Sequence, residues 1–226
     1  MKTINTTENS YSYVPHAAVP MRVIVWSVLT GLALALPGLC LTLVIPVPAP
    51  DAVASARAAQ VYLAPSVIVL KALIILPLIE EFFYRGLLLQ TLRRRLPLWF
   101  AVLVPTILFA ATHLGSGLRN ALFALVAGGY FAWLALRSRS LYPSILCHVA
   151  ANLSGLFVLG PILVAHGIAA PDAMVRPLPL ALLAGSLVVF GAGLRILDAE
   201  FSRAAPVAAA GTKSSLTFPP AFAHHA

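Results

Sequence analysis

ALIILPLIEEFFYR, residues 72–85, is an apolar run that ends in two adjacent glutamates, Glu80 and Glu81, with Arg85 four residues after the second. The chain has 7 acidic residues, and the other five fall in segments predicted as tails, loops or a helix end. A charged side chain at the centre of a bilayer costs about 2.5–3.5 kcal/mol on insertion scales. Two carboxylates and a guanidinium in one apolar helix therefore indicate a functional site.

The composition predicts an integral membrane protein. Of 226 residues, 60% are hydrophobic and 10% are charged, whereas soluble domains carry about 25% charged residues. Apolar runs of about 18 residues or more are candidate membrane spans. We therefore predict an all-α, polytopic transmembrane helical bundle of about six spans, near residues 23–46, 62–90, 98–116, 118–136, 141–164 and 178–197.

The positive charge predicts an orientation rather than nucleic-acid binding, because the arginines bracket apolar segments and form no basic stripe with interleaved aromatic residues. With both termini in the cytoplasm, ten cations lie on cytoplasmic flanks and three in outer loops. The ten are Lys2, Arg22, Arg93, Arg94, Arg95, Arg137, Arg139, Arg195, Arg203 and Lys213, and the three are Arg57, Arg119 and Arg176. This bias favours six spans with cytoplasmic ends.

Composition also divides the chain into three parts. Residues 1–20 are polar and residues 204–226 are rich in Ala and Pro, so both are predicted to be disordered tails. Residues 21–203 form the predicted transmembrane domain. Its working core spans about 66–164, because this stretch contains the ionisable residues of the predicted spans.

Helical spacing separates the roles of the two glutamates. Each residue turns about 100° along an α-helix, so adjacent side chains point in different directions. Arg85 lies four residues after Glu81 and is expected to pair with it. This pairing leaves Glu80 free to act as a general base.

Two further helices contribute candidate catalytic groups. Phe109 and His113 are four residues apart, so the Phe109 side chain can hold the imidazole in place. His148 and Asn152 have the same spacing on the fifth predicted helix. A carboxylate, two imidazoles and a carboxamide suffice to deprotonate water, relay its proton and stabilise an oxyanion.

One geometric condition accompanies this set. His148 follows Arg139 by nine residues, so in a straight helix it is expected nearer the cytoplasm than Glu80 and His113. The catalytic hypothesis requires an irregular or shifted backbone that brings the three groups to one depth.

The three motifs, in this order and spacing, resemble those of the CAAX prenyl protease and bacteriocin-processing family of intramembrane proteases, also called the Abi family. The resemblance covers about residues 66–160. It implies that Glu80 and His113 activate the attacking water and that His148 and Asn152 stabilise the oxyanion. By the same resemblance, Glu81 and Arg85 support the site.

The sequence is compatible with a metal-free mechanism and with a zinc mechanism. A metal-free glutamate mechanism is favoured and needs no cofactor. The alternative is a zinc site made by Glu80, His113 and His148, which are ligands of suitable types. The chain has no His-Glu-x-x-His helix and no spare acidic partner for such ligands, which weighs against zinc.

Other functions are carried as alternatives. Glu80 and Glu81 could relay protons or bind a cation in a transporter, although no repeated or matched broken helices occur. A non-catalytic partner in bacteriocin immunity is another, and a structural ion pair would explain one carboxylate but not both. The expected partners of the protease are the bilayer and a membrane-associated protein or peptide, with no nucleic acid, and the expected location is a prokaryotic inner membrane.

Overall fold

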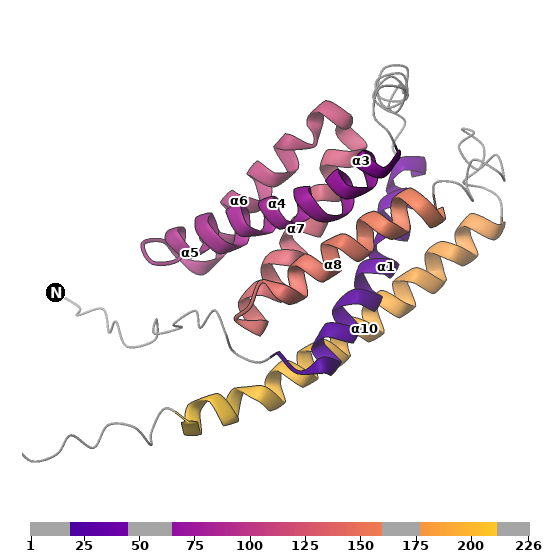
Figure 1. Cartoon of the computed structure of the whole chain (residues 1–226). Coiled ribbons are helices and arrows are strands. Elements are labelled where there is room, and N and C mark those ends of the chain that lie inside the picture. The colour runs from indigo at the N-terminus through magenta and orange to yellow at the C-terminus, as the bar shows by residue number, and fades with distance from the viewer. Residues whose placement is uncertain (1–18, 45–64, 160–176, 212–226) are drawn as a thin grey trace, which may run out of the picture.

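The computed structural model describes residues 19–44, 65–159 and 177–211, and these residues contain helices and no strand (Figure 1). α1 spans Met21–Val44. Five consecutive segments then form one long helix over residues 65–92. They are α3 (Pro65–Leu70), the π-helix η1 (Lys71–Ile75), α4 (Leu76–Glu81), the π-helix η2 (Phe82–Leu88) and α5 (Leu89–Leu92).

The rest of the described chain adds four more helical rods. These are α6 (Leu98–Thr112) followed by the short 3₁₀ turn η3 (Leu114–Ser116), α7 (Leu118–Ser138), α8 (Tyr142–Leu153) continued by the π-helix η4 (Ser154–Leu159), and α10 (Pro177–Gly211). The all-helical prediction is confirmed for the described residues, because all six predicted spans correspond to helical rods.

The C-terminal end of the last helix differs from the prediction. α10 continues to Gly211, so residues 204–211, predicted as part of a disordered tail, are helical. Five of these eight residues are alanine, which has the highest intrinsic helix propensity, although Pro206 within the segment opposes a helix. Nearly all of the predicted N-terminal tail lies outside the described residues.

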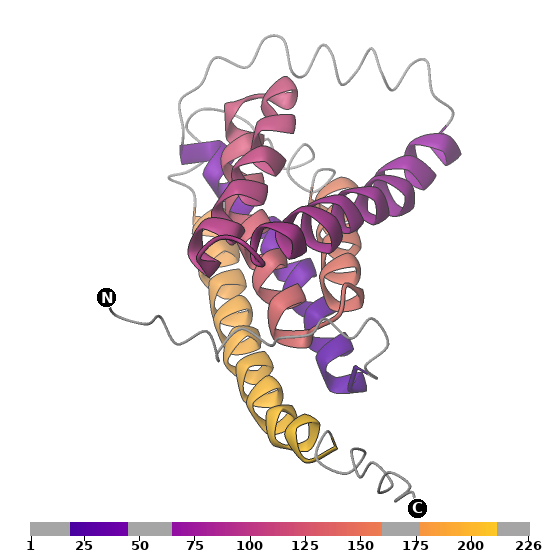
Figure 2. The same cartoon turned by 90° about the vertical axis from the view of Figure 1, so that its left-hand side faces the viewer.

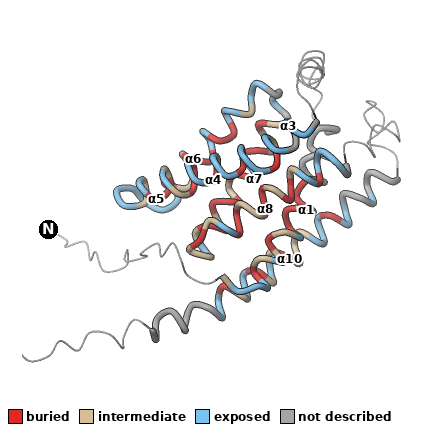
Figure 3. Tube along the Cα trace, viewed as in Figure 1, coloured by how far each residue is buried: buried red, intermediate tan, exposed pale blue. Residues whose placement is uncertain are grey.

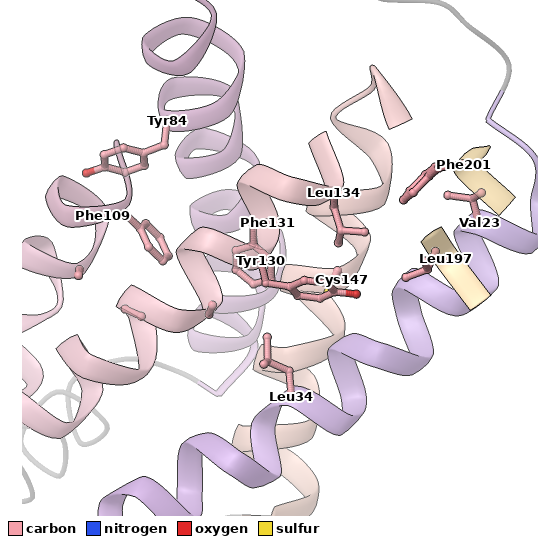
Figure 4. Packing of buried hydrophobic residues seen from close by; sticks show 13 residues of the cluster. Val23, Leu34, Tyr84, Phe109, Tyr130, Phe131, Leu134, Cys147, Leu197 and Phe201 are labelled. Atoms are coloured by element: carbon pink, nitrogen blue, oxygen red, sulfur yellow. The ribbon is translucent and has the colours of Figure 1, made fainter. Parts of the chain in front are cut away.

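α7 lies at the centre of the bundle. One hydrophobic cluster joins Phe131 and Leu134 of α7 to residues of α1, η2, α6, α8 and α10 (Figure 4). α1 packs along both α8 and α10 (Figure 1). In Figure 2 the α3 end of the long helix projects away from the other rods. The described helices thus surround a core that carries the candidate site on one side of α7.

Apolar side chains also cover much of the outer surface. The outward faces of the long helix, α6 and α10 are exposed in Figure 3, and they present large hydrophobic residues such as Phe82 (67% exposed), Trp99 (66%) and Val188 (70%). Contiguous exposed apolar surface is unusual for a soluble monomer and is typical of a surface in contact with a partner or a membrane.

Few of the described helices have the length and composition of a membrane span. Among the described helices, Asn120–Ser138 within α7 is long and apolar enough to span a bilayer. Two shorter apolar stretches, Met21–Pro37 and Leu98–Thr112, fall below that length. Six crossings and cytoplasmic termini therefore stay predictions.

Candidate active site

Glu80 and Glu81 lie at the end of α4, between the two π-helical segments of the long helix. π-helical turns are rare and often mark functional sites. The Glu81 side chain is fully buried, whereas the Glu80 side chain is 22% exposed. The adjacent carboxylates therefore occupy different surroundings, one inside the bundle and one at its margin.

Glu81 pairs with Arg85, as predicted from the spacing. Arg85 Nη1 donates to Glu81 Oε1 at 2.9 Å, and Arg85 Nη2 donates to the carbonyl oxygen of Gly128 on α7 at 3.0 Å. The guanidinium carbon lies 4.5 Å from the centre of the Phe109 ring and 5.4 Å from that of Phe131. Cation–π contacts and the ion pair together stabilise this buried charge.

His148 connects both glutamates. Its Nδ1–H donates to Glu81 Oε1 at 3.0 Å, and its Nε2 lies 3.7 Å from Glu80 Oε2. The ring stacks on Phe131 at a centroid distance of 4.7 Å. An imidazole that donates from Nδ1 to a carboxylate has a defined tautomer and orientation, so Nε2 faces the Glu80 side of the site.

His113 follows the last residue of α6. Its Nδ1 donates to the carbonyl oxygen of Phe109 at 2.8 Å, and the two rings lie 4.7 Å apart. The predicted contact between Phe109 and His113 is therefore present. Glu80 interacts electrostatically with His113 as well as with His148. With Nδ1 occupied, Nε2 is the nitrogen of His113 left for chemistry.

Asn152 lies one turn after His148 on α8 and is half-buried. Its Nδ2 donates to the carbonyl oxygen of Ala72 in η1 at 3.0 Å. This bond attaches α8 to the long helix and uses one of the two amide hydrogens. The second amide hydrogen stays available to another acceptor.

The helices thus bring Glu80 close to His148 and within electrostatic range of His113. His148 therefore reaches Glu80, although it follows Arg139 by only nine residues. A left-handed residue, Arg139 at φ 53°, ends α7 just before α8 begins. This sharp change of direction lets α8 start close to the end of α7. His148, the seventh residue of α8, then reaches the two glutamates.

Several contributors were not predicted. Gly128 has no side chain, and a Cβ there would lie 3.0 Å from Phe109 and 3.2 Å from Arg85. Phe131 stacks on His148, and Gln90 Nε2 donates to the Arg85 carbonyl at 3.1 Å. The adjacent glycines 128 and 129, in a helix that also contains five alanines, were the sequence signal for a close approach.

The zinc alternative concerns the side chains of Glu80, His113 and His148. Within the described ranges, no group of three His, Cys, Asp or Glu side chains is placed to hold a metal ion. His148 Nδ1 and His113 Nδ1 both serve as hydrogen-bond donors. These bonds occupy Nδ1 of each ring and leave both Nε2 atoms for a proton or a metal, so the hydrogen bonds do not decide between the glutamate mechanism and zinc.

Comparison with known proteins identifies this region. Residues 62–154 match the family model described as type II CAAX prenyl endopeptidase Rce1-like. Residues 62–154 are therefore similar to the CAAX protease family, and this stretch is called the CAAX protease segment below. Members of this family are membrane proteins with endopeptidase activity. No curated protein and no solved structure gives a match.

The CAAX protease segment includes all of the candidate site residues. It covers the long helix, α6, α7 and α8, and ends within the first residues of η4. α1 and α10 lie outside it, although α1 packs along α8. The matched bounds agree closely with the range of about 66–160 over which the motifs resemble the family.

Proposed function

We propose that this CAAX protease-like chain is an intramembrane endopeptidase that cleaves a membrane-associated protein or peptide in a prokaryotic inner membrane. The observation that carries the proposal is the placement of partly exposed Glu80 within 3.7 Å of His148 Nε2 and in electrostatic range of His113. A carboxylate beside one imidazole and within electrostatic range of a second is suited to general acid–base catalysis on a water molecule.

The first step is attack by water on the scissile carbonyl carbon. Glu80, assisted by His113 Nε2, takes a proton from the water as the new C–O bond forms. The carbonyl oxygen becomes an oxyanion, which accepts hydrogen bonds from His148 Nε2–H and the free amide hydrogen of Asn152. Glu80 then delivers its proton to the nitrogen as the C–N bond breaks, so the products are a carboxylic acid and an amine.

This assignment requires a proton on Nε2 of His148. Its Nδ1–H is committed to Glu81, so Nε2 donates a hydrogen bond only when the ring carries a second proton. Two carboxylates lie beside the ring, and one of them is also paired with Arg85. Glu81 and Arg85 therefore act as positioning residues that hold His148, with no direct contact to substrate.

The burial of Glu81 disfavours the transport alternative. A relay through both glutamates requires each carboxylate to meet a water-filled path, but Glu81 is 0% exposed and is bonded to Arg85 and His148. No observation on the described residues favours an immunity partner over a protease. A direct cleavage assay separates these functions.

The test compares wild-type protein with Glu80→Gln in bilayer nanodiscs, using a pool of membrane-tethered peptides that includes prenylated and unprenylated C-termini. Since a general base contributes about 10²–10⁴-fold, we expect Glu80→Gln to lose at least about 100-fold in rate. Glu200→Gln, which alters an acidic residue of α10 outside the site, is the matched control and retains activity.

A chelator arm addresses the mechanism. We expect cleavage to survive a strong chelator, because the proposal needs no cofactor. Loss with the chelator and recovery with zinc would instead reassign Glu80, His113 and His148 to a metal. Cleavage by Glu80→Gln at the wild-type rate would overturn the glutamate mechanism.

A further inference from the structure

An open groove of about 440 Å³ lies between α7 and α10, away from the candidate active site. Its lining residues are Tyr130, Trp133, Leu194, Arg195 and Asp198. The residues of α7 that serve the active site are Gly128 and Phe131, which are neighbours in sequence of Tyr130 but face the long helix and α8. The groove therefore belongs to the opposite side of the same helix.

Aromatic rings build the floor of this groove. Tyr130 and Trp133 stack at 5.7 Å on α7, and they reach α10 through ring contacts of Tyr130 with Phe190 at 5.0 Å and of Trp133 with Phe201 at 5.5 Å. The Tyr130 hydroxyl donates to Thr30 of α1 at 2.7 Å and is not left for a ligand. Figure 4 places Tyr130 between α7 and α1. The interior of the groove thus offers apolar surface.

Positive charges outnumber negative charges at the groove. Asp198 is paired with Arg137, whereas Arg195 has no ion pair or hydrogen bond among the residues that the structure describes. On the same end of the bundle, Glu200 is shared by Arg22 at 3.8 Å and Arg203 at 2.8 Å. Four arginines therefore face two carboxylates, which leaves this end positively charged.

We propose that an anionic phospholipid of the surrounding bilayer binds in this groove, with an acyl chain against Tyr130, Trp133 and Leu194 and its phosphate at Arg195. A ligand for such a site needs a long apolar part and a negative head, and basic pockets between transmembrane helices are known to bind anionic head groups. The site rests on the proposed membrane location of the protein and is independent of the proposed peptidase chemistry.

The location of α7 makes a bilayer lipid the favoured occupant. α7 includes the described helix that is long and apolar enough to span a membrane, so its groove side is within reach of acyl chains. The groove is open to the surface, and the exposed neighbours Leu187 (50% exposed) and Val188 (70%) extend apolar surface along α10. A fully polar anion would leave this surface uncovered.

The test uses Trp133 as the reporter. Trp26→Phe and Trp99→Phe together leave Trp133 as the single tryptophan of the 3 in the chain. This protein is placed in nanodiscs of neutral phosphatidylcholine that contain a small fraction of bromine-labelled phosphatidylglycerol or, for comparison, bromine-labelled phosphatidylcholine. Bromine on an acyl chain quenches a neighbouring indole.

We expect bromine-labelled phosphatidylglycerol to quench Trp133 with an apparent affinity about five-fold higher than the neutral lipid, which corresponds to about 1 kcal/mol for one cation near a membrane surface. Arg195→Gln should remove this preference. Arg203→Gln is the matched control, because Arg203 is an exposed arginine of α10 that is paired with Glu200 and does not line the groove.

Other results overturn the proposal. Equal quenching by both lipids shows that the groove does not select an anionic head group. Equal losses in Arg195→Gln and Arg203→Gln show general surface attraction rather than a site. Removal of the preference by millimolar inorganic phosphate would assign Arg195 to a free anion. Peptide cleavage measured on the same nanodiscs reports separately on the peptidase proposal.

Discussion

Glu80 and Glu81 are chemically identical neighbours. They have different roles because the helix turns about 100° between them. Glu81 points into the bundle, where Arg85 and His148 bond to it. Glu80 points to the margin, where its Oε2 lies 3.7 Å from His148 Nε2. Burial and bonding, rather than residue type, separate a carboxylate that holds the site from one that is accessible to water.

This difference predicts opposite effects on stability and catalysis. Glu81→Gln leaves the Arg85 charge buried without its partner, and breaking a buried pair from one side costs about 3–5 kcal/mol. Glu80→Gln removes a partly exposed carboxylate and should cost under about 1 kcal/mol. We expect denaturant unfolding in detergent to show a large loss for the first variant alone. Equal losses would contradict the assignment of roles.

Close approach between helices controls the site at the scale of the element. The Gly128 carbonyl accepts from Arg85 because α7 lies near α6 and the long helix at this point. A side chain at position 128 would displace the Phe109 ring or the Arg85 guanidinium, both of which are almost fully buried. Small residues at helix contacts allow such an approach.

Gly128→Ala is therefore expected to reduce stability by about 1–3 kcal/mol, the usual cost of overpacking, and to lower the cleavage rate by shifting Arg85 away from Glu81. Gly129→Ala is the matched control, because a Cβ there meets no atom within 4 Å. The control should be neutral or slightly stabilising, since alanine favours helix over glycine. Unfolding and cleavage of both variants, measured side by side, test this prediction.

The π-helical segments also influence how the side chains of the site are oriented. η1 and η2 flank α4, and each π-helical turn changes the rotation of the side chains that follow it. Ala72 of η1 accepts from Asn152, and Arg85 of η2 accepts from Gln90 through its carbonyl. Side chains thus satisfy carbonyl groups of the irregular backbone beside the two glutamates.

At the scale of the whole molecule, the site depends on helices outside the CAAX protease segment. A Cβ at Gly31 of α1 would lie 2.3 Å from the carbonyl oxygen of Cys147, the residue before His148, and a Cβ at Gly193 of α10 would lie 2.2 Å from Thr30. α1 is therefore packed without space against α8 and α10. It supports the helix that carries His148.

Gly31→Ala should consequently lower both stability and cleavage, although it lies far from the motifs in sequence. The added methyl meets backbone, which cannot rotate away, so we expect a loss at the upper end of about 1–3 kcal/mol or more. Gly185→Ala on α10, where a Cβ meets nothing within 4 Å, is the control. Unchanged unfolding of Gly31→Ala in detergent would show that α1 is not needed to hold α8.

The sequence predicted the helices of the molecule but not all of their ends or the groove between them. Long apolar runs indicated the helices, since an apolar run of sufficient length has one stable form in a membrane. The end of α10 differed from the prediction, because residues 204–211 lack an apolar pattern and contain Pro206 and yet are helical. The groove between α7 and α10 had no sequence signal, as its lining comes from residues that are separated by a large part of the chain.

Local spacing along one helix accounts for the features that the sequence alone established. Glu81 with Arg85 and Phe109 with His113 are each four residues apart, and helical geometry brings such residues together wherever the helix lies. Contacts between helices required the packed structure. His148 bonds to Glu81 across 67 residues and Asn152 bonds to Ala72 across 80, because the packing of α8 against the long helix, and not the order of residues within either helix, places these groups together.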